Sequence, residues 1–382
     1  MTRTSSTSRY DLDRGELTTL LTGEPRYRVD QVWTGLYEQL ITPAEITTLP
    51  KGLRERLDRD LPEALTLGAE QISDDGDTVK LLWHLDGGAS IETVLMLYPD
   101  RATVCVSTQA GCAMACGFCA TGQAGFTRHL TTGEIVEQVV QASRRARGVG
   151  RRVSNVVFMG MGEPLANEGP VWGAVERLHG GIGLSARHLT ISTVGLVPGI
   201  RRLAERPLPV NLAVSLHAAN DTLRDELVPV NRRYPIDMLI EACRDYLLAK
   251  GRRLSFEWAM IDGVNDRQSD AEELAELCHR LPIGAHVNLI PLNPTPGWPT
   301  VGSPINRVRR FQGWLTDMRV NATVRQNRGT DIDAACGQLA AGQPVTLSPR
   351  RRSAAEVVEA VELPDVAADQ RADERDRAAD PR

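Results

Sequence analysis

The sequence predicts an α/β protein, a full or partial β/α barrel with a small helical domain at its N-terminus. From about residue 101, short apolar runs rich in β-branched residues alternate with amphipathic helical stretches. This alternation indicates parallel strands joined by right-handed crossover connections. Polar and glycine-rich residues follow the apolar runs, at the strand ends where barrel enzymes place their active sites.

Two smaller elements are expected before the barrel. Residues 1–75 are expected to form a helical domain, because apolar side chains within 14–60 recur at three- and four-residue spacing. Residues 76–100 are expected to form a connecting β-hairpin around the Asp-Gly-Gly turn at 86–88.

The barrel domain itself is expected over residues 101–345. The apolar runs expected as strands are 103–107, 155–160, 188–193, 210–218, 254–261, 286–293 and 321–325. The clearest helical patterns between them are 132–147, 235–250, 267–281 and 304–318. Residues 346–382 are rich in Ala, Arg, Asp and Glu and lack a core pattern, so we expect a disordered tail.

The charge of the chain is unevenly distributed. The formal net charge is −5, from 44 basic and 49 acidic residues. Residues 354–382 hold four of the basic and nine of the acidic residues, which leaves the body neutral with 40 of each. Arginines cluster at 144–152, at 252–253 and at 307–310, and such clusters either contact phosphates or form solvated helix faces.

Cysteine content and hydropathy favour a reducing compartment. Seven cysteines in 382 residues do not make a disulfide scaffold. There is no stretch of about 18 apolar residues and no apolar N-terminal signal, so we expect a cytoplasmic protein with no membrane partner. Cys243 and Cys278 lie in helical patterns and are expected in the core.

Three cysteines form the strongest chemical signal in the sequence. Cys112, Cys116 and Cys119 follow the first barrel strand with C-x3-C-x2-C spacing. Three thiolates on one loop can converge on one metal centre, and a structural zinc ion would need a fourth ligand such as His129. A four-iron cluster usually has four cysteine ligands, so three would leave one iron open to a substrate.

The triplet resembles the signature of the radical S-adenosylmethionine (SAM) superfamily. The resemblance implies a [4Fe-4S] cluster that chelates SAM, cleavage of SAM to a 5′-deoxyadenosyl radical, and a partial (β/α)6 barrel. A Gly-Glu-Pro segment binds the SAM amino group in that superfamily. The SAM-binding residues expected here are Gly162, Glu163, Ser192, Ser215, Leu216, His217 and Asn293. Without the resemblance, the residues at the later strand ends would be interpreted as capping and turn residues.

Further segments narrow the resemblance to one family. They are IETV at 91–94, the run at 101–130, MGMGEPL at 159–165, STVG at 192–195, SLHA at 215–218, PLNPTPG at 291–297 and RGTDIDAACGQL at 328–339. Over roughly residues 25–342 the chain resembles the RNA methyltransferases that modify adenine C2. Their substrates are the peptidyl-transferase region of 23S ribosomal RNA and the anticodon loop of transfer RNA. His129, where Asn is expected, and the acidic tail depart from the family pattern.

The resemblance implies a mechanism that uses two further cysteines. Adenine C2 is electron-poor and cannot attack the SAM methyl group itself. Cys336 would take a methyl group from one SAM, and a second SAM would yield the radical that activates this methyl for bonding to C2. Glu92 would take the C2 proton, and Cys105 would attack the Cys336 sulfur, releasing RNA and forming a disulfide. Without the resemblance, Glu92 would be a hairpin carboxylate and both cysteines small buried side chains.

Partners and alternatives follow from the same resemblance. It implies an RNA partner recognised at an unpaired adenine, with the arginine clusters and the N-terminal domain holding phosphates. It also implies an electron donor such as flavodoxin or ferredoxin, and we expect a monomer. Three alternatives stay open: a C8-methylating relative with the same cysteines, a glycyl-radical activase, and a non-catalytic, zinc-stabilised RNA-binding protein.

Overall fold

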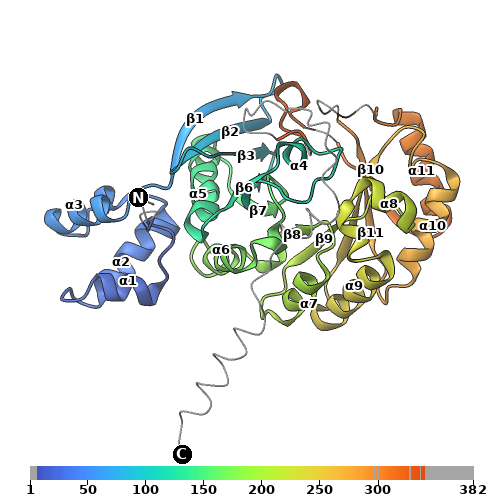
Figure 1. Cartoon of the computed structure of the whole chain (residues 1–382). Coiled ribbons are helices and arrows are strands. Elements are labelled where there is room, and N and C mark those ends of the chain that lie inside the picture. Colours follow the sequence, from blue (N-terminus) through green and yellow to red (C-terminus); the bar gives the residue numbers. More distant parts are fainter. Residues whose placement is uncertain are drawn as a thin grey trace, which may run out of the picture.

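The sheet at the centre of the molecule contains ten strands, in the order β1-β2-β3-β4-β7-β8-β9-β10-β11-β12. The computed structural model describes residues 7–293, 295, 298, 301–326, 328–335 and 337–339. From β4 onward neighbouring strands are parallel, whereas β1, β2 and β3 extend the sheet in antiparallel pairs. Figure 1 shows the parallel strands with helices around them, and the N-terminal helices beyond the antiparallel strands.

The parallel strands coincide with the seven apolar runs expected from the sequence. They are β4 (Ala102–Cys105), β7 (Val153–Phe158), β8 (Leu189–Thr193), β9 (Asn211–Ser215), β10 (Leu254–Met260), β11 (His286–Pro291) and β12 (Asn321–Val324). Their apolar side chains are buried because helices cover the outer face, which is why the runs are nearly continuous in the sequence. The sheet ends at β1 and β12, so the barrel is partial, as expected.

Helices connect the parallel strands, and all four expected helical stretches are present. The helices of this part are α5 (Thr132–Gly148), α6 (Glu168–Gly180), α7 (Val197–Glu205), α8 (Asp221–Leu227), α9 (Ile236–Lys250), α10 (Gln268–His279) and α11 (Ile305–Asp317). Short 3-10 turns are η3 (Pro164–Ala166), η4 (Ala186–His188), η5 (Pro229–Arg232) and η6 (Thr330–Ile332). Among the described helices, none is long and apolar enough to cross a membrane.

The antiparallel extension is larger than the sequence indicated. The expected hairpin consists of β2 (Thr78–Leu85) and β3 (Ser90–Leu97), but β1 (Leu65–Ile72) also pairs with β2. The expected boundary at residue 75 is therefore wrong, because β1 belongs to the sheet. Only the first residue of β1 is buried, so this edge strand lacks the apolar alternation that reveals a strand.

The N-terminal helices pack against α5. They are α1 (Arg14–Leu20), α2 (Tyr27–Trp33), η1 (Thr34–Gln39), η2 (Pro43–Glu45) and α3 (Lys51–Asp60). The Arg144 guanidinium on α5 donates to the Leu40 carbonyl at 2.6 Å, and the Asp11 carboxylate accepts from the Gly133 amide at 2.7 Å. Arg147 likewise donates to the Gln39 and Glu38 carbonyls, so two arginines of the 144–152 cluster hold this helical segment. The acidic tail lies outside the described residues.

Candidate active site

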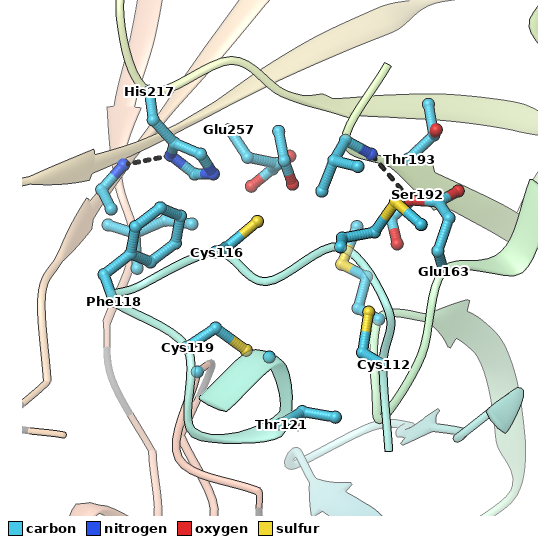
Figure 2. A pocket seen from close by; sticks show the side chains of 18 of the residues that line it. Cys112, Cys116, Phe118, Cys119, Thr121, Glu163, Ser192, Thr193, His217 and Glu257 are labelled. Carbon is cyan, nitrogen blue, oxygen red and sulfur yellow. Dashed lines mark hydrogen bonds between the residues drawn. The ribbon is translucent and has the colours of Figure 1, made fainter. Parts of the chain in front are cut away.

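A cavity of about 1000 Å³ opens at the carboxyl ends of the parallel strands, where a β/α barrel places its active site. The residues that line it include Cys112, Cys116, Cys119, Met159, Gly162, Glu163, Ser192, Thr193, Ser215, His217, Glu257, Arg325 and Gly337. Figure 2 shows the three cysteine side chains on one loop facing Glu163 and Ser192 on one side and His217 on the other. The structure thus brings most of the expected cofactor residues together.

The loop with the cysteine triplet is held at both ends. It follows β5 (Gln109–Gly111), which pairs with β6 (Phe126–His129), and it leads into α4 (Ala120–Ala124). The Cys112 amide donates to the Gly125 carbonyl at 2.8 Å, and the Cys119 amide donates to the Cys116 carbonyl at 3.2 Å. Ala115 has a left-handed φ of 54°, an uncommon conformation for alanine that is often found at functional sites.

The thiols of this loop suit a cluster better than a single ion. Burial raises the pKa of both the Cys112 and the Cys116 thiol, so these side chains need a strongly cationic partner to bind as thiolates. Sulfur ligands of one zinc ion lie about 4 Å apart. Among the described residues, no three His, Cys, Asp or Glu side chains lie close enough to hold one ion. A four-iron cluster does not require the three sulfurs to share one ion, because its cysteines bind different irons.

Glu163 presents a buried carboxylate to the cavity. Its oxygens accept hydrogen bonds from the Leu165 amide at 3.0 Å and from the Val194 amide at 2.8 Å. Burial raises the pKa of Glu163 to about 7, and within the described chain no Lys or Arg forms an ion pair with it. A ligand ammonium group would offset that cost, which fits the SAM amino group. Gly162 before it has a φ of 103°, and a Cβ there would meet Gln109 at 2.6 Å.

His217 contributes a hydrogen-bond donor of fixed orientation. Its Nδ1 accepts a hydrogen bond from the Ala259 amide at 3.0 Å, so the proton of the neutral ring lies on Nε2. Burial lowers the pKa of His217 to about 3, which keeps the ring neutral at physiological pH. The Phe118 ring packs against it edge-on at 4.7 Å, and Figure 2 shows the two rings at the wall of the cavity.

The remaining expected SAM residues differ in their placement. Ser192 and Ser215 line the cavity, and Ser192 Oγ donates to the Phe158 carbonyl at 2.6 Å. Leu216 is fully buried and is not among the cavity-lining residues described. Asn293 is buried just after β11 and is likewise not among them. The departure at His129 is connected to the site, because His129 Nδ1 lies 3.1 Å from Gln109 Nε2, and Gln109 Oε1 accepts from the Glu163 amide.

A second cavity, of about 1060 Å³, adjoins the first. Both cavities are lined by Cys119, Thr121, Met159, Gly160, Arg325 and Gly337. The second cavity is also lined by Cys105, Met96, Tyr98 and Arg328, and no described acidic side chain lines it. Cys336 lies outside the described residues, but its neighbours Ala335 and Gly337 both line the second cavity. Cys105 and the two neighbours of residue 336 therefore share one cavity next to the cysteine triplet.

Glu92 lies beside this second cavity. It is on the same face of β3 as Val94 and Met96, which both line the cavity, because alternate residues of a strand share a face. Its carboxylate oxygen lies 3.4 Å from the ammonium nitrogen of Lys80 on β2.

Three residues near the cavities were not expected from the sequence. Lys80 is one of them. Glu257 of β10 lines the first cavity and also a third cavity, which Arg252 and Arg253 line as well. Its Oε1 accepts a hydrogen bond from Asn288 Nδ2 at 2.8 Å. Arg224 is fully buried, and its guanidinium donates to the carbonyls of Val194 at 2.7 Å and Leu216 at 3.1 Å. The alternation of polar and apolar residues in β10 could have revealed Glu257 from the sequence. The sequence around Arg224 instead predicts an ordinary residue on a helix surface.

Comparison with known proteins assigns the family. The model of the radical SAM superfamily matches residues 106–278. A probable dual-specificity RNA methyltransferase RlmN of Chloroflexus aurantiacus is 52% identical, across 89% of this chain and 94% of its own. The dual-specificity RNA methyltransferase RlmN 1 of Myxococcus xanthus is 50% identical, across 88% of this chain and 95% of its own. The chain belongs to the RlmN family of the radical SAM superfamily.

A solved structure agrees with membership of the RlmN family. A radical SAM methyltransferase from Sphaerobacter thermophilus is 53% identical and superposes with a TM-score of 0.85, covering 88% of this chain and 99% of that one. The expected radical SAM fold and cofactor class, a [4Fe-4S] cluster with SAM, are thereby confirmed. The glycyl-radical activase and the non-catalytic zinc protein are set aside.

Proposed function

We propose that this RlmN-family protein methylates C2 of adenine in 23S ribosomal RNA and in transfer RNA, through a methyl group carried on Cys336. The observation that supports this most directly is the pair of adjoining cavities. One is lined by the cysteine triplet and by Glu163, and the other by Cys105 and the neighbours of residue 336. Because the two cavities share lining residues, a radical formed in the first would have a short path to a methyl group in the second.

RNA as the substrate is supported by the charge of the second cavity and by the relatives. Arg325 and Arg328 line this cavity, and two cationic side chains at its wall suit a polyanion. Each also lies near a carboxylate that does not line the cavity, Arg325 at 3.9 Å from Glu257 and Arg328 at 3.3 Å from Asp77. The curated relatives bear the name dual-specificity RNA methyltransferase. We further propose that the protein works as a cytoplasmic monomer with an electron donor such as flavodoxin or ferredoxin.

The proposed first half-reaction uses one SAM. The Cys336 thiolate attacks the methyl carbon of SAM and displaces S-adenosylhomocysteine, which leaves the methyl group on Cys336 as S-methylcysteine. Cys112, Cys116 and Cys119 would hold the cluster, while Glu163 and the Nε2–H of His217 would orient SAM. When bound there, the cluster and a second SAM would supply the radical chemistry, namely removal of a hydrogen atom from the S-methyl group and acceptance of one electron once the methylene carbon is bonded to C2.

The proposed second half-reaction uses residues of the second cavity. Glu92 takes the C2 proton, which restores the aromatic ring and leaves a thioether between Cys336 and the base. The Cys105 thiolate then attacks the Cys336 sulfur, so that a disulfide forms and the sulfur–carbon bond breaks. Its electron pair stays on carbon, which takes a proton and becomes the methyl group. A thiol reductant regenerates both cysteines.

Replacement of the carrier cysteine tests this proposal. Cys336→Ala should abolish methylation of RNA by the anaerobically reconstituted enzyme, because it removes the thiol proposed to carry the methyl group. Cys278→Ala, a buried cysteine on α10, is the matched control and should retain activity. Mass spectrometry of nucleosides from a deletion strain gives the position: loss of 2-methyladenosine supports C2, and loss of 8-methyladenosine would support the C8 alternative instead. Undiminished methylation by Cys336→Ala would overturn the carrier role.

A further inference from the structure

A lysine on the β-hairpin points toward the second cavity. Lys80 of β2 lies directly opposite Val94 of β3, and Leu82 lies opposite Glu92. Residues opposite each other in an antiparallel pair share a face, so Lys80, Glu92 and Val94 are on the same side of the sheet. Because Val94 lines the second cavity, this is the side that faces it.

Lys80 contacts two groups that the proposed chemistry needs. Its ammonium nitrogen lies 3.4 Å from the Glu92 carboxylate, and the two side chains are only 11% and 6% exposed. The same nitrogen donates to the Asp333 carbonyl at 3.4 Å, three residues before Cys336. One side chain therefore connects the proposed base with the segment that bears the proposed methyl carrier.

The contact to Asp333 is one of several between the hairpin and this segment. The Asp331 carboxylate accepts from the Asp74 amide at 2.8 Å, and the Arg328 guanidinium donates to the Leu97 carbonyl at 3.2 Å. These two contacts hold the segment at the connection between β1 and β2 and at the last residue of β3. Lys80 makes the contact that lies next to Glu92. Because the other two contacts already hold the segment, the Lys80 contact is not needed for that purpose alone.

Stability alone gives little reason for such a pair. Desolvation of two buried charges offsets most of their attraction, and replacing a buried ion pair by apolar groups is often neutral or stabilising. The position of Lys80 beside the second cavity is thus better explained by the orientation that it gives to the Glu92 carboxylate than by a contribution to stability. A fixed ion pair restricts the carboxylate to one orientation, as proton transfer requires.

We propose that Lys80 is a positioning residue for the proton transfer from C2. Its ammonium group orients the Glu92 carboxylate and keeps it in register with the Cys336-bearing segment. This inference rests on the proposed function. It assigns to Lys80 no contact with SAM or with the cluster, so the methylation of Cys336 should not depend on it.

The test separates the two half-reactions in the full-length, anaerobically reconstituted enzyme. Lys80→Met removes the charge and keeps the length of the side chain, and Lys80→Arg keeps the charge. Lys51→Met on α3, where the side chain is 81% exposed, is the matched control. Three quantities are measured: S-methylation of Cys336, the fraction of enzyme covalently joined to RNA, and the loss of deuterium from RNA whose adenines are deuterated at C2.

The expected result is a block confined to the second half-reaction. Lys80→Met should S-methylate Cys336 at the wild-type rate, lose C2 deuterium roughly 10- to 100-fold more slowly, and accumulate the covalent RNA adduct. Lys80→Arg should restore deuterium loss to within about threefold of wild type, and Lys51→Met should match wild type throughout. Glu92→Gln should show the same block, and adding Lys80→Met to it should slow deuterium loss no further.

Two results would overturn the inference. If Lys80→Met loses C2 deuterium at the wild-type rate, Lys80 does not position the base. If S-methylation and adduct formation by Lys80→Met fall in parallel with its melting temperature, Lys80 has only a structural role. Lys80→Gln, which can still donate to the Asp333 carbonyl, then repeats the comparison in a folded protein. Failure of the proposed function looks different, because wild-type enzyme would then carry no methyl group on Cys336.

Discussion

Two side chains in the first cavity have their hydrogen-bonding roles set by backbone amides. The Ala259 amide fixes the proton of His217 on Nε2, and the Val194 and Leu165 amides occupy one position on each oxygen of Glu163. Groups held in this way need little reorganisation when a ligand arrives. The cavity therefore offers a donor and an acceptor at its two sides before SAM is bound.

Loss of the Glu163 charge should weaken SAM binding. Glu163→Gln removes the anion that would pair with the SAM ammonium group, and a hydrogen bond to a charged group contributes about 1.5–3 kcal/mol. We expect the dissociation constant of SAM to rise about 10- to 100-fold in the cluster-loaded enzyme, measured by equilibrium dialysis without RNA. Glu137→Gln is the matched control, because Glu137 is also a buried glutamate that accepts a backbone hydrogen bond, at 2.8 Å from Ala64. A change of less than twofold in Glu163→Gln would remove Glu163 from the SAM site.

Residues that follow a barrel strand and line the cavity can be predicted from the sequence more readily than residues that only position another side chain. Glu163 and His217 follow barrel strands in recognisable motifs and are found in the cavity. Lys80 is an isolated lysine in an apolar strand, and its partner becomes visible only when the hairpin register is known. That register follows from the turn at 86–88, so Lys80 was within reach of the sequence. Arg224 was not, because its carbonyl partners come from separate loops.

At the scale of elements, α5 joins the N-terminal helices to the barrel through a buried acid. Glu137 of α5 is fully buried and accepts from the Ala64 amide, just before β1. Burial raises the pKa of Glu137 to about 7 from a usual 4.5. The folded state therefore binds more protons than the unfolded state between these two values, so this group's contribution to stability falls as the pH rises from 4.5 to 7.

Removal of this acid should change the pH dependence of stability. Glu137→Gln keeps an acceptor for the Ala64 amide and abolishes the ionisation. We compare the free energy of unfolding of the variant with that of wild type at each pH. The difference, variant minus wild type, should be about 2–3 kcal/mol more positive at pH 8 than at pH 5. Urea unfolding of the full chain at both pH values measures this difference. An equal difference between variant and wild type at pH 5 and pH 8 would show that Glu137 ionises normally in the folded protein.

Elements with two buried faces could be predicted, and elements at an edge could not. The apolar runs of β7 and β10 stand out because helices and neighbouring strands cover them. The edge strand β1 is exposed along seven of its eight residues, so its composition resembles a loop. The boundary of the N-terminal segment was misplaced for this reason, whereas the helical character of 14–60 followed from its periodicity.

At the scale of the whole molecule, the open side of the barrel is where the two cavities meet. The sheet ends at β12, and the chain that follows returns to the opposite side of the barrel. The Gly337 carbonyl accepts from the Ala120 amide beside the cysteine triplet at 2.8 Å, and Arg328 contacts β3. A closed barrel would leave no room for this segment. The partial barrel thus leaves room for one chain segment to line a cavity together with Cys119 of the triplet and Cys105.

Arginines around Tyr98 mark the side from which RNA should approach. Tyr98 lines the second cavity, and the Arg101 and Arg328 guanidinium groups lie 4.5 and 4.4 Å from its ring centre. An arginine held over an aromatic ring is well placed to contact the backbone of an unpaired strand. Each phosphate contact steepens the salt dependence of binding.

Arg101→Gln should therefore weaken RNA binding and flatten its dependence on salt. We expect the slope of log K against log salt concentration to fall in magnitude by about 0.7–1, with S-methylation of Cys336 unchanged. Arg280→Gln is the matched control. Arg280, directly after α10, is paired with Asp237 at 2.8 Å and is 43% exposed, much as Arg101 is paired with Asp100 at 3.1 Å and is 47% exposed. Binding of an unmodified transfer RNA transcript over a salt series measures both slopes. Equal slopes for the two variants would mean that RNA does not cross the Tyr98 side of the opening.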